Sequence, residues 1–182
     1  MHYGEIKTCD IANGAGVRST LFVSGCRNAC PGCFNPETWS FSYGEEFTRE
    51  AADRLIESLR PGFVAGITIL GGEPMEPENQ EVLAPFLERV RAELPDKSIW
   101  LYSGFTWEEL THGENRARTP FTERILATLD VLVDGRFVLA LKDITLRFRG
   151  SSNQRILDVP ASLEAGRAVL WEDDAVFSTH AW

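Results

Sequence analysis

Four short apolar segments alternate with longer amphipathic ones, and this alternation most constrains how the chain can fold. The short segments are rich in β-branched, aliphatic and aromatic residues, which predicts strands at 18–24, 66–70, 98–102 and 130–134. Apolar residues at helical spacing predict helices at 48–60, 78–94 and 119–129. Strands that alternate with helices form right-handed βα units and a parallel sheet. A full eightfold barrel needs about 250 residues. The chain has 182, so we expect an α/β fold of the incomplete, laterally open (β/α) barrel type.

Local signals predict where several helices begin and end. Thr48 is a good N-cap for the first helix, and Thr106 with Glu109 forms a capping-box pattern. Pro120 is expected at the first position of its helix. Pro85 falls inside the 78–94 pattern, so we expect either a late start or a kink there.

Three of the four cysteines, Cys26, Cys30 and Cys33, lie in one eight-residue loop with the spacing C-x3-C-x2-C. Iron–sulfur clusters are held by cysteine thiolates, and a four-iron cluster normally takes four of them. Three thiolates leave one iron free to bind a small molecule. The loop follows the predicted strand 18–24, and ligand sites of α/β sheets lie at the carboxyl ends of strands.

Two other interpretations of the thiols stay open. One is a structural zinc site with Cys9 as the fourth ligand, since zinc takes four ligands from Cys and His. The other is a chance grouping of unrelated thiols. A lone cysteine such as Cys9 is more often a small buried hydrophobic residue than a ligand. The three histidines lie near the termini or in a loop, and we expect them to be solvated.

Glycine-bearing polar turns follow the other predicted strands. Gly71 and Gly72 precede Glu73 directly after strand 66–70, while Ser103 and Asp134 begin the turns after the next two strands. Glycines let the backbone approach a ligand closely, and the Glu73 carboxylate could pair with an ammonium group. A plain structural turn is the alternative. If the strands are parallel, these residues form one rim suited to an extended ligand.

Composition restricts the class of protein. With 43% hydrophobic and 25% charged residues, the chain can build an ordinary core as one domain, 1–182, in which 159–182 shows no pattern we can assign. No apolar run approaches the roughly 20 residues of a membrane span, and no export signal stands at the amino terminus. The net charge of −9 argues against general nucleic-acid binding. Clustered thiols indicate a reducing compartment, so we expect a cytoplasmic protein.

Several segments together resemble the radical S-adenosylmethionine activating enzymes of glycyl radical proteins. They are Asn13-Gly-x-Gly-x-Arg18, the cysteine loop with Phe34-Asn35, the stretches 100–109 and 130–137, and Arg-Gly-Ser-Ser-Asn-Gln-Arg at 149–155. The last three narrow the resemblance to the activators of anaerobic ribonucleoside-triphosphate reductase. The resemblance covers about residues 3–158 and implies the radical S-adenosylmethionine type of open barrel.

The resemblance also implies a reaction. A [4Fe–4S] cluster on Cys26, Cys30 and Cys33 passes one electron to the sulfonium of S-adenosylmethionine, and the S–C5′ bond breaks to give methionine and a 5′-deoxyadenosyl radical. That radical takes a hydrogen atom from a glycine Cα, so no side chain serves as acid or base. The implied cofactor contacts are Gly32, Cys33, Phe34, Gly71, Gly72, Glu73, Ser103 and Asp134. Related enzymes often place an aromatic residue where Gly32 stands, so adenine contacts are expected from the Gly32–Phe34 backbone and the Phe34 ring.

The implied partners are the large subunit of the reductase and reduced flavodoxin or ferredoxin as electron donor, with no nucleic acid and no membrane. Segment 149–155 is polar and carries no apolar periodicity, which fits a solvated loop as well as a partner contact. The resemblance favours the second and implies Arg149, Asn153 and Arg155 as partner contacts. Two other functions remain open. One is a small-molecule radical enzyme such as 7-carboxy-7-deazaguanine synthase, and the other is a non-catalytic zinc or iron–sulfur module.

Overall fold

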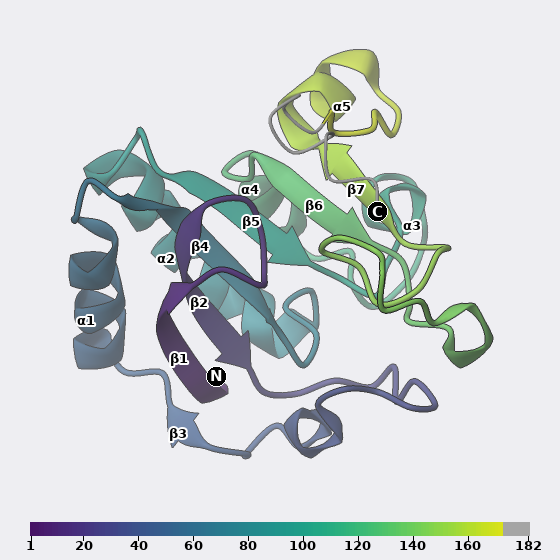
Figure 1. The fold of residues 1–182 in the computed structure, drawn as a ribbon, viewed down its shortest axis with the longest axis horizontal. Helices are drawn as coiled ribbons and strands as arrows, with labels where there is room; N and C mark the ends of the chain where they lie inside the picture. Colours follow the sequence, from purple (N-terminus) through teal and green to yellow (C-terminus); the bar gives the residue numbers. More distant parts are fainter. Residues whose placement is uncertain (173–182) are drawn as a thin grey trace.

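The computed structural model describes residues 1–172, in which seven strands form one open mixed sheet (Figure 1). The strands are β1 (His2–Asp10), β2 (Val17–Val23), β3 (Glu45–Glu46), β4 (Val64–Gly71), β5 (Ser98–Tyr102), β6 (Val131–Asp134) and β7 (Arg155–Asp158). Their order is β3-β1-β2-β4-β5-β6-β7. The four predicted strands β2, β4, β5 and β6 are parallel neighbours, as expected, whereas β1 and β7 flank them antiparallel. The sheet does not close, so what is established is an α/β fold with an open mixed sheet.

Five helices accompany the strands. They are α1 (Arg49–Leu59), α2 (Pro77–Glu93), α3 (Trp107–Thr111), α4 (Thr122–Leu126) and α5 (Val159–Ala165), with short 3-10 turns at Pro36–Trp39 and Leu139–Leu141. The Thr48 hydroxyl accepts a hydrogen bond from Ala51 N at the start of α1, which confirms the predicted N-cap. The capping box of Thr106 and Glu109 is also present at α3.

The prediction for Pro120 is wrong, and of the two outcomes expected for Pro85 the late helix start is wrong. Pro120 precedes α4, which begins at Thr122 and has five residues, so proline is not at the first helical position. Pro85 lies inside α2, which begins early, at Pro77. Pro85 and Glu81 are both exposed, so water can reach the carbonyl that an interior proline leaves without its helical hydrogen bond.

One face of the sheet is packed by helices. Leu55 of α1, Leu87 of α2 and Ile125 of α4 belong to one buried cluster with alternate residues of the strands, including Ile67 and Leu101. Because successive side chains of a strand point to opposite faces, the residues between them, such as Trp100 and Val133, form a separate small cluster on the other face. This second face carries the candidate site.

Arg18 fills the amino-terminal end of the second face. Only 1% of it is exposed. Its guanidinium donates to Thr68 Oγ1 at 2.7 Å, to the Ile67 carbonyl at 2.7 Å and to the Ser98 carbonyl at 2.9 Å. Burial lowers its pKa to about 10, so it stays charged near neutral pH. The Asn13–Arg18 motif therefore closes one end of the sheet, in the hairpin between β1 and β2.

The structure corrects two expectations at the ends of the chain. Cys9 is exposed rather than buried. Part of the segment left unassigned is ordered: it forms α5, Leu170 forms an antiparallel bridge with Leu157, and Trp171 packs edge-on against Trp100 with ring centroids 5.1 Å apart. Residues 173–182 lie outside the described part. Within residues 1–172, none of the helices has the length and apolar character that crossing a bilayer requires.

Candidate metal centre

The cysteine loop begins where β2 ends. Gly25 adopts a φ of 98°, and Pro31-Gly32 forms a turn in which Gly32 has a φ of 73° and Cys33 N donates to the Cys30 carbonyl at 3.1 Å. Proline followed by a residue with positive φ is the pattern of a type II turn. The Pro-Gly pair therefore sets the path between the second and third thiols.

Buried Glu76 anchors the start of the cysteine loop, next to Cys26. It accepts hydrogen bonds from the Arg27 backbone N–H at 2.9 Å and from the Arg27 guanidinium at 2.7 Å, and it also pairs with Arg116 at 3.0 Å. Arg27 in turn stacks over the Phe41 ring, 4.3 Å from its centroid. Our sequence analysis missed Glu76; its only signal was a carboxylate three residues after Glu73.

Glu73 joins the cysteine loop to the ends of β4 and β5. Its Oε1 accepts from Met75 N at 3.0 Å and from Ser103 Oγ at 2.8 Å. Its Oε2 accepts from Asn28 Nδ2 at 2.9 Å and from Gly104 N at 2.7 Å. Burial raises the pKa of Glu73 to about 7. Its carboxylate is thus fully hydrogen-bonded within the protein, because a carboxylate offers about four acceptor sites.

The glycines before Glu73 allow the strand ends to approach. Gly72 N donates to the Val23 carbonyl at 2.7 Å, and a Cβ on Gly72 would meet the Gly25 carbonyl oxygen at 2.7 Å. The buried Asn79 amide, which our sequence analysis also missed, donates to the carbonyls of Ser24 at 3.1 Å and Glu73 at 2.9 Å. The cysteine loop and the Gly-Gly-Glu turn therefore form one bonded unit.

A cavity of about 510 Å³ opens at these strand ends. Eight of the residues singled out from the sequence line it, together with Arg149: they are Cys26, Cys30, Cys33, Phe34, Gly71, Gly72, Glu73 and Ser103. Asn28, Trp39 and Tyr102 also line it and were not anticipated. The turns after β2, β4 and β5 thus border one cavity, whereas β6 contributes Gly135 rather than the predicted Asp134.

The far wall of the cavity comes from residues 136–150, which we call the flap. Phe137, Leu146 and Phe148 line the cavity from this side. The Phe137 ring packs edge-on against Phe34 with centroids 5.2 Å apart, and a Cβ on Gly32 would meet Leu139 Cδ1 at 2.8 Å. The flap therefore lies directly on the cysteine turn.

Two predicted cofactor contacts, Gly32 and Asp134, do not line the cavity. Two predicted partner contacts, Asn153 and Arg155, make their polar contacts within the protein. Asp134 is fully buried, and its carboxylate accepts from Trp107 N at 2.7 Å and pairs with Arg155 at 2.5 Å. Arg155 pairs also with Glu108 at 2.7 Å. Asn153 donates to the Arg136 carbonyl at 2.8 Å. Asp134 and Arg155 are therefore engaged with each other, behind the cavity rather than in it.

Three cavity residues carry buried donors without a partner in the described part of the chain. They are Trp39 Nε1, Tyr102 Oη and Arg149 Nε. Burial holds the pKa of the Tyr102 hydroxyl above its usual value, so the group stays protonated. A buried donor without an acceptor carries a free-energy penalty of about 1–3 kcal/mol. The three atoms themselves lie below the accessible surface, so an acceptor on a ligand in the cavity would relieve this penalty only after these side chains turned toward it.

The thiols border the cavity but are not drawn together. Within residues 1–172, no three His, Cys, Asp or Glu side chains form a group that could hold a metal ion as they stand. Burial raises the pKa of Cys26 to about 11 and raises that of Cys30 as well. Metal binding requires thiolates and releases their protons, so loading would change both the protonation and the spacing of these groups.

Cys9 lies too far away to be a fourth ligand. The antiparallel register pairs Tyr3 with Val23 and Asp10 with Arg18, which places Cys9 at the opposite end of β2 from Cys26. Five strand residues separate these ends, roughly 17 Å at about 3.3 Å per residue. The zinc site that would use Cys9 as a ligand is therefore wrong.

Comparison with known proteins agrees with the iron–sulfur interpretation of the loop. Residues 12–157 match the family described as a 4Fe-4S single cluster domain. Proteins named anaerobic ribonucleoside-triphosphate reductase-activating protein are 40% identical over 158 residues in Vibrio cholerae (86% of this chain, 97% of the relative) and 42% identical in Haemophilus influenzae with the same coverage. One from Enterobacteria phage T4 is 36% identical over 156 residues, 86% of this chain and 93% of the relative. No solved structure gives a significant match.

The family match runs from the β1–β2 hairpin to β7, which is the part that builds most of the cavity and carries its thiols. Identity of about 40% over almost the whole length of the relatives is well above what a shared fold alone would give. The chain belongs to the family of anaerobic ribonucleoside-triphosphate reductase-activating proteins.

Proposed function

We infer that this protein generates a glycyl radical on the large subunit of an anaerobic ribonucleoside-triphosphate reductase by reductive cleavage of S-adenosylmethionine. The observation that carries the inference is that Cys26, Cys30 and Cys33 border one cavity of about 510 Å³ together with the Gly-Gly-Glu turn after β4. The relatives' name supplies the reductase as the partner. Reduced flavodoxin or ferredoxin as electron donor, and the open sheet as an incomplete barrel of the radical S-adenosylmethionine type, belong to the same proposal.

The donor set fits a [4Fe–4S] cluster with one open iron. Cys26, Cys30 and Cys33 border the same cavity, while Cys9 lies at the far end of β2. When bound, the cluster would supply the electron for S-adenosylmethionine cleavage and an open iron for its methionine part. Leu139 and Phe137 lie over the cysteine turn and its neighbour Phe34, so the flap would shield the cluster from water.

The cavity also fits S-adenosylmethionine, which has a cationic end and many acceptor atoms. Trp39, Tyr102 and Arg149 line the cavity and carry unpartnered donors, which would reach its carboxylate, ribose or adenine acceptors if these side chains turned toward the ligand. Gly71, Gly72 and Ser103 would bring the backbone close to the methionine part, and Cys33 and Phe34, which line the cavity, would contact adenine. The Glu73 carboxylate, whose acceptor sites are filled, would attract the ammonium group through its charge.

The decisive experiment is anaerobic incubation of the reconstituted protein with S-adenosylmethionine, reductant and the reductase. We expect methionine to form and a glycyl doublet to develop in the electron paramagnetic resonance spectrum of the reductase. Methionine without the doublet would favour the alternative of a small-molecule substrate. Neither product, with an intact cluster by absorption, would contradict the proposed function.

Glu73→Gln should weaken S-adenosylmethionine binding about tenfold while leaving the cluster in place. Because its acceptor sites are filled, Glu73 would act through charge alone: two unit charges about 8 Å apart interact by about 2 kcal/mol at an effective dielectric constant of about 20, and about 1.4 kcal/mol corresponds to a factor of ten. Anaerobic titration measures the affinity, and cluster absorption with a melting curve shows whether the loop survives. Unchanged affinity would leave Glu73 with only the structural role of joining the strand ends.

A further inference from the structure

Exposed apolar side chains gather on the outer side of the flap. Ile144 is 89% exposed, Leu139 52% and Leu141 43%. With Val138 and Phe34 they make up half of the ten large hydrophobic residues exposed within residues 1–172. Single exposed apolar residues are normal, but a contiguous group marks an interaction surface.

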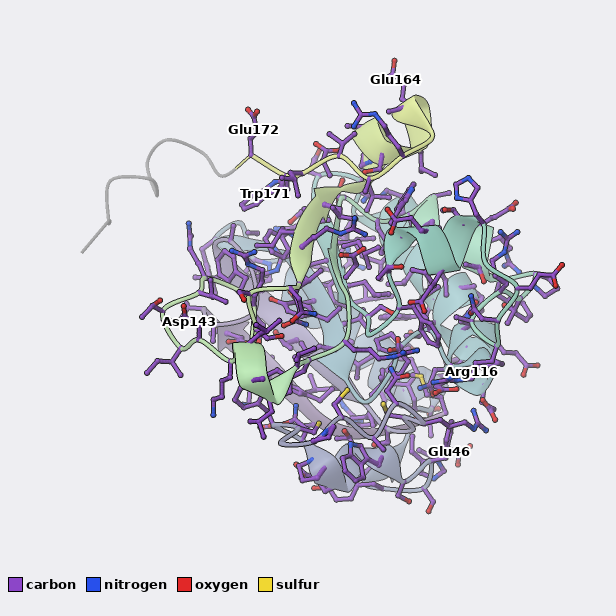
Figure 2. All side chains as sticks on the ribbon, turned by 90° about the vertical axis from the view of Figure 1, so that its right-hand side faces the viewer. Glu46, Arg116, Asp143, Glu164, Trp171 and Glu172 are labelled. Carbon is purple, nitrogen blue, oxygen red and sulfur yellow. The ribbon has the colours of Figure 1, made fainter. Side chains whose placement is uncertain are left out.

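The group is contiguous with the cysteine turn. The Lys142 ammonium lies over the Phe34 ring, 5.1 Å from its centroid, and Leu139 lies against Gly32. The same flap lines the cavity on its inner side through Phe137 and Phe148. Figure 2 shows Asp143, next to Ile144, at the outer margin of the molecule.

The flap is held by the segment that our sequence analysis assigned to partner binding. Ser152 N donates to the Leu141 carbonyl at 2.9 Å, and Val138 N donates to Ser151 Oγ at 3.2 Å. Gln154 Nε2 donates to the Gly135 carbonyl at 3.0 Å, while its Oε1 accepts from Gly150 N at 2.8 Å. Segment 149–155 thus uses its polar groups to anchor the flap. Fixing a surface before binding reduces the entropy lost on association.

The charge of the flap differs from that of the chain. Residues 136–150 contain four basic residues and one acidic residue, a net charge of +3, whereas the chain as a whole carries −9. The basic residues are Arg136, Lys142, Arg147 and Arg149. An acidic partner is therefore attracted to the flap and repelled by most of the remaining surface.

We propose that the outer side of the flap, with Phe34, is the docking surface for the protein substrate, and that it receives an acidic segment with apolar side chains next to the reacting glycine. This rests on the proposed function, since a protein that inserts a residue into the cavity must cover the cavity's mouth. The flap forms one wall of the cavity, so a substrate backbone that entered beside it would contact its exposed Leu139, Leu141 and Ile144.

The test uses the full-length reconstituted protein carrying Leu141→Ser and Ile144→Ser. Neither side chain lines the cavity. We expect the affinity for the reductase to fall at least tenfold and the glycyl radical yield to fall with it at limiting reductase. Cleavage of S-adenosylmethionine by a chemical reductant without the reductase should stay unchanged. Lys142→Glu should weaken reductase binding and reduce its dependence on salt.

The matched control carries Phe63→Ser and Leu163→Ser, which remove two exposed apolar side chains, 65% and 47% exposed, away from the cavity. It should bind the reductase normally. The assignment would be overturned if the flap variant bound the reductase normally, or if the control lost as much reductase affinity as the flap variant. It would also be overturned if the flap substitutions abolished association between copies of this protein and left reductase binding intact. If the unaltered protein did not cleave S-adenosylmethionine, the proposed function would be refuted. The comparison of reductase binding between the flap variant and the control would still test the docking surface.

Discussion

Alanine at Cys26, Cys30 or Cys33 should abolish the four-iron cluster and all S-adenosylmethionine cleavage, whereas Cys9→Ala should leave both unchanged. The loop supplies only three thiolates, and the fourth cysteine, Cys9, lies too far away to replace one of them. One iron of the cluster would already have no protein ligand. Removing one of the three thiolates would leave two irons without one. Iron and sulfide analysis after anaerobic reconstitution, together with the visible absorption of the cluster, measures how much cluster each variant holds.

Cys9→Ala is the matched control, because it removes a thiol of the same kind from the opposite end of β2. Cys9 is exposed, so its loss creates no cavity in the core. Loss of iron in proportion to protein in this variant would contradict the three-thiolate model. It would also return the four-cysteine site to consideration.

The parallel core of the fold was predictable because its signals are local. Strand β5 was predicted with the observed bounds, and β2, β4 and β6 within two residues at each end. Apolar runs identify such strands since both faces of the sheet are covered. Strand β7 was missed because it has only four residues and is stabilised by pairing with β6. A local sequence pattern does not reveal such a long-range pairing.

The candidate site was predictable in its positions and not in its pairings. Parallel strands bring their carboxyl ends to one edge, which is enough to place the thiols, Glu73 and Ser103 together. Which partner each polar group chooses is a long-range matter. Glu73 was expected to face a ligand, but Asn28 and Gly104 fill one of its oxygens and Ser103 with Met75 the other. The polarity of 149–155 indicated a partner surface for the same reason, since sequence cannot distinguish a polar group that binds internally from one that is free.

Arg155→Ala should therefore act on stability rather than on partner recognition. Its guanidinium lies 2.5 Å from the fully buried Asp134 carboxylate, and its removal would leave that charge with only the Trp107 N–H. Breaking a buried ion pair by removing one partner destabilises a protein by about 3–5 kcal/mol. Because the Arg155 side chain is 34% exposed, we expect the lower end of that range. For a chain of this size, about 3 kcal/mol lowers the melting temperature by about 6–12 °C.

A double-mutant cycle with Asp134→Asn separates the pair from the loss of side-chain volume. The double variant should be more stable than the sum of the two single effects predicts, because asparagine leaves no buried charge. Asn153→Ala removes one exposed hydrogen bond to the flap, so its free energy of unfolding should lie within about 1 kcal/mol of that of the unaltered protein. If Arg155→Ala instead melted normally and lost only reductase binding, the arginine would contact the partner, as its sequence context first indicated. The pairing with Asp134 would then contribute little to holding β6 and β7 together.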